Sequence, residues 1–145
     1  MSAAQARSVA ALLGVRRSKA HPADAFALAA AVAKGLSVDA VDRLCAAMAP
    51  ADPSLRYRIV PKATLARRQR TRRLSSDESE RLARLARIWA FAVEVWGSEA
   101  AARQFLAKPH PLLAGRVPRD FAAETEIGAR EVENLIGGLK YGTAV

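Results

Sequence analysis

The sequence predicts an all-α protein. Alanine is frequent, hydrophobic residues make up 51% of the chain and aromatic residues only 6%, a composition that suits helices joined by short loops. Apolar residues recur at three- and four-residue spacing in segments that glycines and prolines separate. At 145 residues, the chain has room for one or two small domains with a modest core.

Three helices are expected before residue 50. They cover residues 3–13, 25–34 and 37–48. Gly14 and Gly35 end the first two helices, and residues 15–22 form a basic linker between them. Ser37 is the expected N-cap of the third helix, and Pro50 prevents its continuation.

Residues 55–73 form the most distinctive segment because they contain eight basic residues and no acid. The basic residues are Arg56, Arg58, Lys62, Arg67, Arg68, Arg70, Arg72 and Arg73. A short helix over residues 55–59 would be followed by a turn at Val60 and Pro61. A second helix over residues 62–70 would complete a helix-turn-helix.

We expect Leu65 to anchor the second of these helices in the core. A helical step of about 100° per residue then directs Arg67 and Arg70 outward and places Thr64 at the edge of the same face. Such a face fits the DNA major groove, where Arg reads guanine and Thr meets a phosphate or a thymine methyl. The alternative interpretation is a solvated basic linker. Residues 58–61 lack the usual turn glycine, which leaves the DNA-binding geometry open.

Charge is unevenly distributed along the chain. Residues 1–75 carry 14 Lys and Arg against 4 Asp and Glu, whereas residues 76–145 carry 9 against 10. The net charge of +9 and the isoelectric point near 10.8 indicate an anionic partner, either nucleic acid or a membrane surface. A basic half followed by a neutral half is typical of a nucleic-acid-binding module joined to a module with another task.

The second half begins with a strong helix signal, the capping box of Ser75 and Glu78. This helix should end at Gly97 and carries an apolar stripe of Leu82, Leu85, Trp89, Ala92 and Trp96. Such a stripe most often packs within the chain, and the alternative is packing against a second copy. Three arginines lie off the stripe and are expected in solvent: Arg81, Arg84 and Arg87. A further helix is expected over residues 98–108.

The last third combines a loop around Gly115 with a helical turn opened by Pro118. An amphipathic helix follows from about Thr125 and is expected to end at Gly137 and Gly138. Gly128, inside this helix, indicates close approach of another backbone. The apolar stripe expected to close the core consists of Val132, Leu135, Ile136 and Leu139.

The residues argue against several classes of function. Cys45 is the only cysteine and is expected to be a buried apolar residue, so no intramolecular disulfide is available. Neither His21 nor His110 has a Cys, Asp or Glu at metal-ligand spacing, and no catalytic triad or phosphate-binding glycine loop occurs. The longest apolar run, residues 25–33, is short for a membrane span, and no cleavable signal peptide is recognisable. We therefore expect a cytoplasmic protein without cofactor or enzymatic activity.

The C-terminal motifs resemble those of a known family. Residues 111–121 (PLLAGRVPRDF), residues 126–133 (EIGAREVE) and the closing Tyr141 and Gly142 resemble the toxin-binding domain of the Xre/MbcA/ParS antitoxins. The segment Thr-Leu-Ala-Arg-Arg that begins at Thr64 resembles the helix-turn-helix of the same family. The resemblance covers residues 37–145, and residues 1–36 carry no part of it.

The resemblance implies a type II antitoxin with three parts. Residues 1–36 would be an N-terminal helical extension, residues 37–74 an Xre-like helix-turn-helix DNA-binding domain, and residues 75–145 a small helical toxin-binding domain. The partner implied for many members is a RES-domain toxin that degrades NAD⁺, whose active site the C-terminal domain would cover. The antitoxin would also repress its own operon, as a homodimer within a larger toxin-antitoxin complex.

The expected site residues fall into two sets. The expected DNA contacts are Lys62, Thr64, Arg67, Arg68, Arg70, Arg72 and Arg73. The expected toxin contacts are Leu112, Leu113, Arg116, Phe121, Tyr141 and Val145. Leu113 and Phe121 are equally candidates for the core. A toxin that binds an anionic dinucleotide needs a cationic cleft, which Tyr141, backbone carbonyls and the Val145 carboxylate suit.

Two other functions remain compatible with the sequence. The first is a helix-turn-helix regulator without a toxin partner, whose C-terminal domain serves dimerisation. A toxin-like reading frame beside the gene would separate this regulator from an antitoxin. The second is an RNA-binding accessory protein, which is disfavoured because Tyr57 is the only aromatic residue within the basic run.

Overall fold

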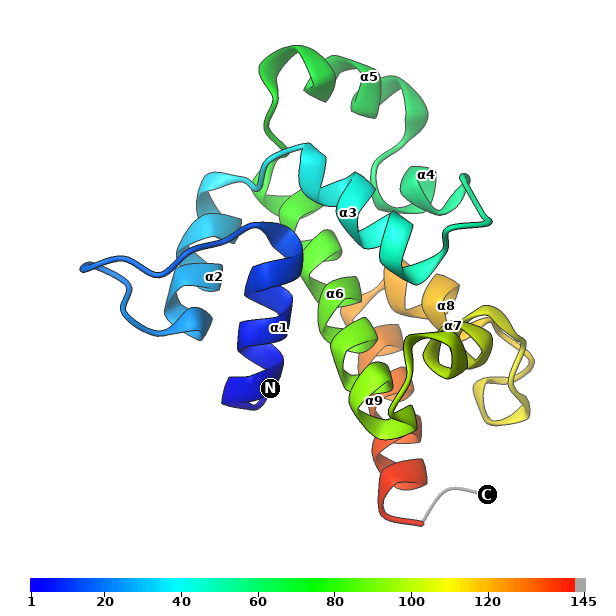
Figure 1. Cartoon of the computed structure of the whole chain (residues 1–145). Coiled ribbons are helices and arrows are strands. Elements are labelled where there is room, and N and C mark those ends of the chain that lie inside the picture. Colours follow the sequence, from blue (N-terminus) through cyan, green and yellow to red (C-terminus); the bar gives the residue numbers. More distant parts are fainter. Residues whose placement is uncertain (143–145) are drawn as a thin grey trace.

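The computed structural model describes residues 1–142 and shows an all-α protein, as predicted (Figure 1). The helices are α1 (Ala3–Leu13), α2 (Asp24–Lys34), α3 (Asp39–Met48), α4 (Leu55–Ile59), α5 (Lys62–Thr71), α6 (Ser76–Trp96), α7 (Glu99–Ala107), the 3-10 turn η1 (Pro111–Leu113), α8 (Pro118–Glu124) and α9 (Glu126–Lys140). No helix within residues 1–142 is long and apolar enough to cross a membrane.

Helix α6 is the central element of the fold. It packs against α1, α2, α3 and α4 of the first half of the chain and against α7, α8 and α9 of the second half. Figure 1 shows α6 running through the middle of the molecule, with α1 and α2 on one side and α8 and α9 on the other. Its fully buried residues include Leu82, Leu85, Ala86, Ile88 and Ala92. They cover an arc of about 160° around the helix, which is wide enough to face both groups.

Local sequence signals determine where α6 begins and ends. Ser75 Oγ accepts a hydrogen bond from the Glu78 N–H at 3.2 Å, and the Glu78 carboxylate accepts one from the Ser75 N–H at 2.8 Å. The predicted capping box is therefore confirmed. Gly97 ends the helix in the left-handed conformation, with φ of 69°.

The expected start of α3 at Ser37 is wrong. The helix begins at Asp39, two residues later than expected, although Ser37 Oγ still accepts a hydrogen bond from the Asp39 N–H at 3.3 Å. The backbone before it pairs instead with the segment that follows α5, because the Val38 N–H donates to the Arg72 carbonyl and the Leu74 N–H to the Leu36 carbonyl, at 3.2 and 2.9 Å. Tertiary pairing thus holds Ser37 outside the helix.

The expected end of α9 at Gly137 and Gly138 is also wrong, because the helix continues to Lys140. The Tyr141 N–H still donates to the Gly137 carbonyl at 3.1 Å. Leu139, in the last turn, packs against the core. Continuing the helix keeps that apolar contact, which offsets the low helix propensity of glycine, about 1 kcal/mol relative to alanine.

The expectation that Arg81, Arg84 and Arg87 are solvated is contradicted as well. Their hydrogen-bond partners are the main-chain oxygens of Ile59, Ala122 and Ala123 and the carboxylates of Glu126 and Glu133. Arg84 binds both alanine carbonyls at 3.1 Å, at the end of α8 where helix carbonyls lack intrahelical partners. Burial lowers the pKa of Arg84 below its ordinary value. These arginines therefore fasten α6 to its neighbours.

Replacing Gly128 with alanine should destabilise the protein, because the added Cβ would clash with the main-chain oxygen of Phe121 in α8. We expect a loss of about 1–3 kcal/mol, seen as a lower melting temperature in circular dichroism. Gly137→Ala is the matched control in the same helix. Its Cβ would lie 4.0 Å from Phe91, an ordinary contact distance, so its stability should be unchanged or higher. Equal melting temperatures for the two variants would contradict the close approach at Gly128.

Candidate functional site

Helices α4 and α5 form the short helix pair predicted from the basic segment. Leu55, Ile59 and Val60 are completely buried, so α4 and the turn after it are fixed in the core. Val60 is extended, with φ of −133°, as a residue before proline prefers. Pro61 directly precedes α5, and its carbonyl accepts the first hydrogen bond of the helix, from the Leu65 N–H at 2.8 Å.

Helix α5 projects from one end of the molecule (Figure 1). Leu65 is its only buried residue, as predicted, and is 7% exposed. A ten-residue helix is marginal in water on its own, so polar contacts must help to fix it.

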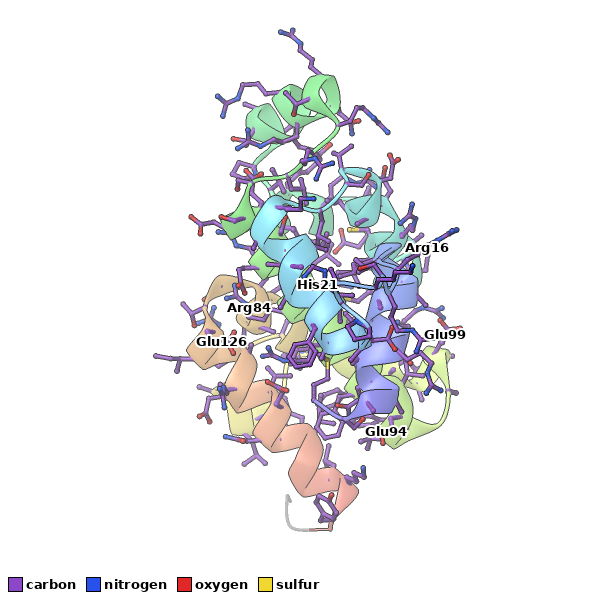
Figure 2. All side chains as sticks on the ribbon, turned by 90° about the vertical axis from the view of Figure 1, so that its left-hand side faces the viewer. Arg16, His21, Arg84, Glu94, Glu99 and Glu126 are labelled. Atoms are coloured by element: carbon purple, nitrogen blue, oxygen red, sulfur yellow. The ribbon has the colours of Figure 1, made fainter. Side chains whose placement is uncertain are left out.

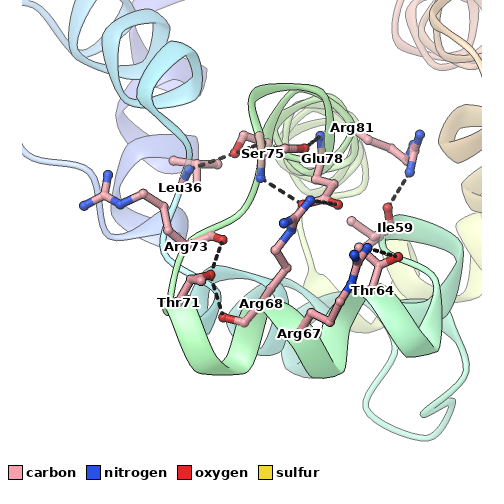
Figure 3. A network of polar contacts seen from close by, with 11 residues as sticks. Leu36, Ile59, Thr64, Arg67, Arg68, Thr71, Arg73, Ser75, Glu78 and Arg81 are labelled. Atoms are coloured by element: carbon pink, nitrogen blue, oxygen red, sulfur yellow. Dashed lines mark hydrogen bonds and ion pairs between the residues drawn. The ribbon is translucent and has the colours of Figure 1, made fainter.

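The strongest of these contacts joins Arg68 to Glu78, in the first turn of α6 (Figure 3). The guanidinium binds both carboxylate oxygens, at 2.8 and 3.1 Å, and the Glu78 side chain is only 11% exposed. Burial alone would raise the pKa of Glu78, but the hydrogen bonds from Arg68 and Ser75 outweigh it and lower that pKa. Arg68 therefore positions α5, which sequence reasoning did not foresee.

The end of α5 is fixed by two further arginines. Arg72 adopts the left-handed conformation, with φ of 62°, and its guanidinium pairs with Asp39 of α3 at 2.6 Å. Arg73 donates to the Gly35 carbonyl at 3.1 Å. Thr71 directly precedes these two arginines, and its Oγ1 donates a hydrogen bond to the Arg68 carbonyl (Figure 3).

Three cations of α5 remain available on its outward surface. Lys62, Arg67 and Arg70 are exposed, and none forms an ion pair with an acid within residues 1–142. Lys62 lies 5.8 Å from the Tyr57 ring centre, and Arg67 donates to Thr64 Oγ1 at 3.5 Å (Figure 3). The seven expected DNA contacts thus divide into two groups. Lys62, Thr64, Arg67 and Arg70 remain available to a partner molecule. Arg68, Arg72 and Arg73 also stabilise the fold.

At the other end of the chain, the loop before α8 is closed by its own hydrogen bonds. The His110 N–H donates to the Arg116 carbonyl at 3.1 Å, and the Gly115 N–H donates back to the His110 carbonyl at 3.0 Å. Leu112 projects from this loop and is 54% exposed, whereas Leu113 is 6% exposed and belongs to the core. Of these two leucines, only Leu112 is therefore accessible to a toxin.

Arg116 organises the surface beside this loop. Its guanidinium lies 4.8 Å from the centre of the Phe121 ring and forms an ion pair with Glu124. Phe121 is partly buried against the core, so it presents only part of its ring. Leu112, Arg116 and Phe121 thus belong to the loop and to the helix that follows it.

Tyr141 lies far from the loop that carries Leu112 and Arg116. It is 75% exposed and follows the last turn of α9, thirteen residues beyond Gly128, which approaches Phe121. That separation corresponds to about 20 Å along the helix axis. Val145 lies outside the described residues. The structure therefore places the expected toxin contacts at both ends of α9 and does not gather them into one cluster.

Ile127 was not predicted as a functional residue. It is 76% exposed, which makes it the most exposed of the large hydrophobic residues of the described chain. Ile127 and Asn134 are seven residues apart and are exposed on the outward face of α9, and Tyr141 follows the end of that helix. The sequence signal was present, because Ile127 lies off the apolar stripe that packs α9 into the core. An isolated exposed Ile is common, which makes that signal weak.

Two ion pairs join α8 to the helix-turn-helix. Arg119, whose side chain is 12% exposed, contacts Asp52 at 2.5 Å, and Asp120 contacts Arg58 of α4 at 3.2 Å. Hydrogen bonding from Ser54 and the charge of Arg119 lower the pKa of Asp52. No group of three or more potential metal ligands occurs within residues 1–142. The arrangement therefore provides two separate surfaces on one connected scaffold.

Comparisons with known proteins fit this division. Residues 27–87 match the Antitoxin Xre-like helix-turn-helix domain, and residues 91–142 match the Antitoxin Xre/MbcA/ParS C-terminal toxin-binding domain. An Antitoxin Xre of Yersinia enterocolitica is 38% identical over 111 residues, which is 74% of this chain and 74% of the relative. This chain belongs to the Xre family of antitoxins.

Two other Xre antitoxins are similar over shorter stretches. The one from Pseudomonas putida is 36% identical over 85 residues, covering 58% of this chain and 53% of the relative. The one from Photorhabdus laumondii is 37% identical over 71 residues, covering 48% and 47%. The family predicted from the C-terminal motifs is confirmed, and its two domains support a type II antitoxin with DNA binding. Both matched ranges end or begin inside α6, and residues 1–26 of this Xre antitoxin lie outside them.

Glu78→Gln should make this Xre antitoxin less stable at neutral pH and less sensitive to acid. The pKa of Glu78 is lower in the folded chain, so its ion pair stabilises the fold above its ordinary pKa of 4.5 and is lost as the pH falls through and below that value. We expect a loss of about 1–3 kcal/mol at pH 7 in urea unfolding, and a smaller difference at pH 3. Asp77→Asn, which changes an exposed carboxylate in the same turn, is the control. A wild-type pH profile for Glu78→Gln would show that the pair contributes nothing.

Proposed function

We propose that this Xre antitoxin neutralises a RES-domain toxin that degrades NAD⁺ and represses its own operon through α5. The match of residues 91–142 to a toxin-binding domain supports the first activity. The observation that carries the second is the outward face of α5, where Lys62, Arg67 and Arg70 have no acidic partner within residues 1–142.

DNA binding through α5 follows from the division of its arginines. Arg67 and Arg70 are free to read base edges or meet phosphates, while Lys62 lies at the start of the helix, beside Tyr57. Arg68, Arg72 and Arg73 hold the helix at a fixed angle and add positive charge nearby. Readers of this type usually bind two half-sites as dimers, so the proposal includes a homodimer on operator DNA.

Toxin binding is proposed to use the exposed apolar residues of the C-terminal domain. Leu112, Ile127 and Tyr141 are the large hydrophobic residues that this domain leaves in solvent. Exposed anchors of this kind supply much of the affinity in protein interfaces. The tail from Lys140 onward would reach the cationic cleft that an NAD-binding enzyme needs, and Leu112 and Ile127 would extend the contact beyond the cleft.

Arg67→Ala and Arg70→Ala should each weaken binding to DNA from upstream of the gene without lowering the melting temperature. Loss of a base contact would weaken the free energy of DNA binding by about 1–3 kcal/mol. Loss of a phosphate contact would reduce the slope of log K against log salt concentration by about 0.9. Gel shifts over a range of salt concentrations measure both effects. Lys108→Ala removes the same charge from an exposed residue after α7 and is the control. Unchanged midpoints for both α5 variants would show that α5 does not bind the operator.

The toxin partner should be encoded beside the gene and should co-purify with this antitoxin on co-expression. Ile127→Asp and deletion of residues 140–145 should each raise the Kd at least about tenfold in calorimetry, because each removes an exposed anchor. Phe26→Ala is the control, since Phe26 is 65% exposed on α2, outside the matched toxin-binding domain. A neighbouring protein that fails to bind, together with intact DNA binding, would leave a regulator without a toxin.

A further inference from the structure

The loop between α1 and α2 lies outside both matched domains and is strongly basic. Arg16, Arg17 and Lys19 are exposed, and residues 15–22 contain no acid. Arg17 is 3.8 Å from Asp24, at the start of α2, and its side chain remains 66% exposed. The loop therefore presents three cations to solvent.

This loop is an ordered turn. The Ser18 N–H donates to the His21 carbonyl at 3.0 Å, and the His21 N–H donates back to the Ser18 carbonyl at 3.2 Å. Ser18 Oγ accepts a further hydrogen bond from the His21 N–H at 3.1 Å. These bonds place Lys19 at the tip of a closed turn. Figure 2 shows Arg16 and His21 on one face of the molecule, below α5.

Helix α3 lies between the loop and the end of α5 and carries a further exposed cation. The Arg43 guanidinium of α3 lies against Gly14, where the loop begins, and a side chain at Gly14 would clash with it. Arg43 is exposed and follows Asp39 by one helical turn, about 6 Å along α3. Asp39 is the residue that pairs with Arg72 after α5.

A second route connects the two regions through α2. Lys34 is exposed at the end of α2, and the carbonyl of the next residue, Gly35, accepts a hydrogen bond from Arg73. Figure 1 shows the loop leaving the bundle on the side where α5 ends. The exposed cations Arg73, Lys34 and Arg43 thus lie between α5 and the loop, and the carboxylate of Asp39 among them is paired with Arg72.

We propose that residues 15–21, with Lys34 and Arg43, bind DNA phosphates that flank the segment contacted by α5. The proposal rests on the DNA binding proposed for α5, and it assigns a role to residues 15–21, which the matched domains leave out. A regularly spaced phosphate backbone suits exposed cations on an ordered turn. Residues 16–21 contain no large apolar side chain, so the loop lacks the anchors that a protein interface or a membrane surface requires.

The test compares the double variant Arg16→Ala/Lys19→Ala with Lys108→Ala/Arg130→Ala, which removes the same charge from exposed residues of the C-terminal half. Arg130 pairs with Glu126 at 3.5 Å, but its side chain is 73% exposed, so its loss should cost little stability. Arg17 is kept because it contacts Asp24. Binding is measured as a function of salt concentration on two duplexes from upstream of the gene. One has about 40 base pairs, and the other has about 20 base pairs and contains only the central segment that the antitoxin protects from nuclease digestion. On the long duplex, the slope of log K against log salt should fall by about 1.8 for the loop variant only. On the short duplex, the two variants should bind alike.

Two results would overturn the proposal. Equal slopes for the loop and control variants on the long duplex would show that the loop does not touch DNA. A loop variant that binds DNA normally but loses affinity for the co-purified toxin would assign the surface to protein binding. Failure of α5 itself is distinguishable, because Arg67→Ala would then leave DNA binding unchanged.

Discussion

Burial of α6 by helices from both halves of the chain is the constraint on which the remaining structure depends. Leu85, Ile88 and Ala92 have no exposed surface, because helices from each half cover them. Neither half can keep its apolar residues out of water without this helix. Since burial contributes roughly 25 cal/mol per Å² of apolar surface, separation of the two halves would expose a large part of the core. The two binding regions therefore share one folding unit.

Charged groups reinforce this connection where the apolar core ends. Arg84 and Arg87 fasten α6 to α8 and α9, while the pairs Arg119–Asp52 and Arg58–Asp120 fasten α8 to the helix-turn-helix. Removing one partner of a largely buried pair costs more than the pair itself contributes, because the remaining charge stays desolvated. Phe121, beside the proposed toxin surface, directly follows Asp120 in sequence. The proposed DNA surface and the proposed toxin surface are thus connected through α8.

The sequence predicted those features that depend on neighbouring residues. The capping box at Ser75, the stop at Gly97 and the core contact of Leu65 each follow from a few adjacent side chains, and all three are confirmed. Features that depend on distant partners were missed. Arg84 finds its carbonyls 38 and 39 residues away, and pairing with residues 72–74 holds Ser37 outside α3. Arg67 is free, whereas Arg68 binds Glu78. The sequence could not distinguish these two roles, because they depend on the orientation of α5 relative to α6. The roles of the site residues in DNA and toxin binding stay predictions.

The small buried surface of α5 has an evolutionary consequence. Because Leu65 and the Arg68–Glu78 pair are the main contacts that hold this helix, the remaining positions on its outward face can change with little effect on folding. The outward face of α9 has the same freedom at the opposite end of the molecule. Duplicated copies of such a gene can therefore acquire a new operator while keeping their toxin, or a new toxin while keeping their operator. Cross-talk between related systems in one genome can be removed at either surface separately.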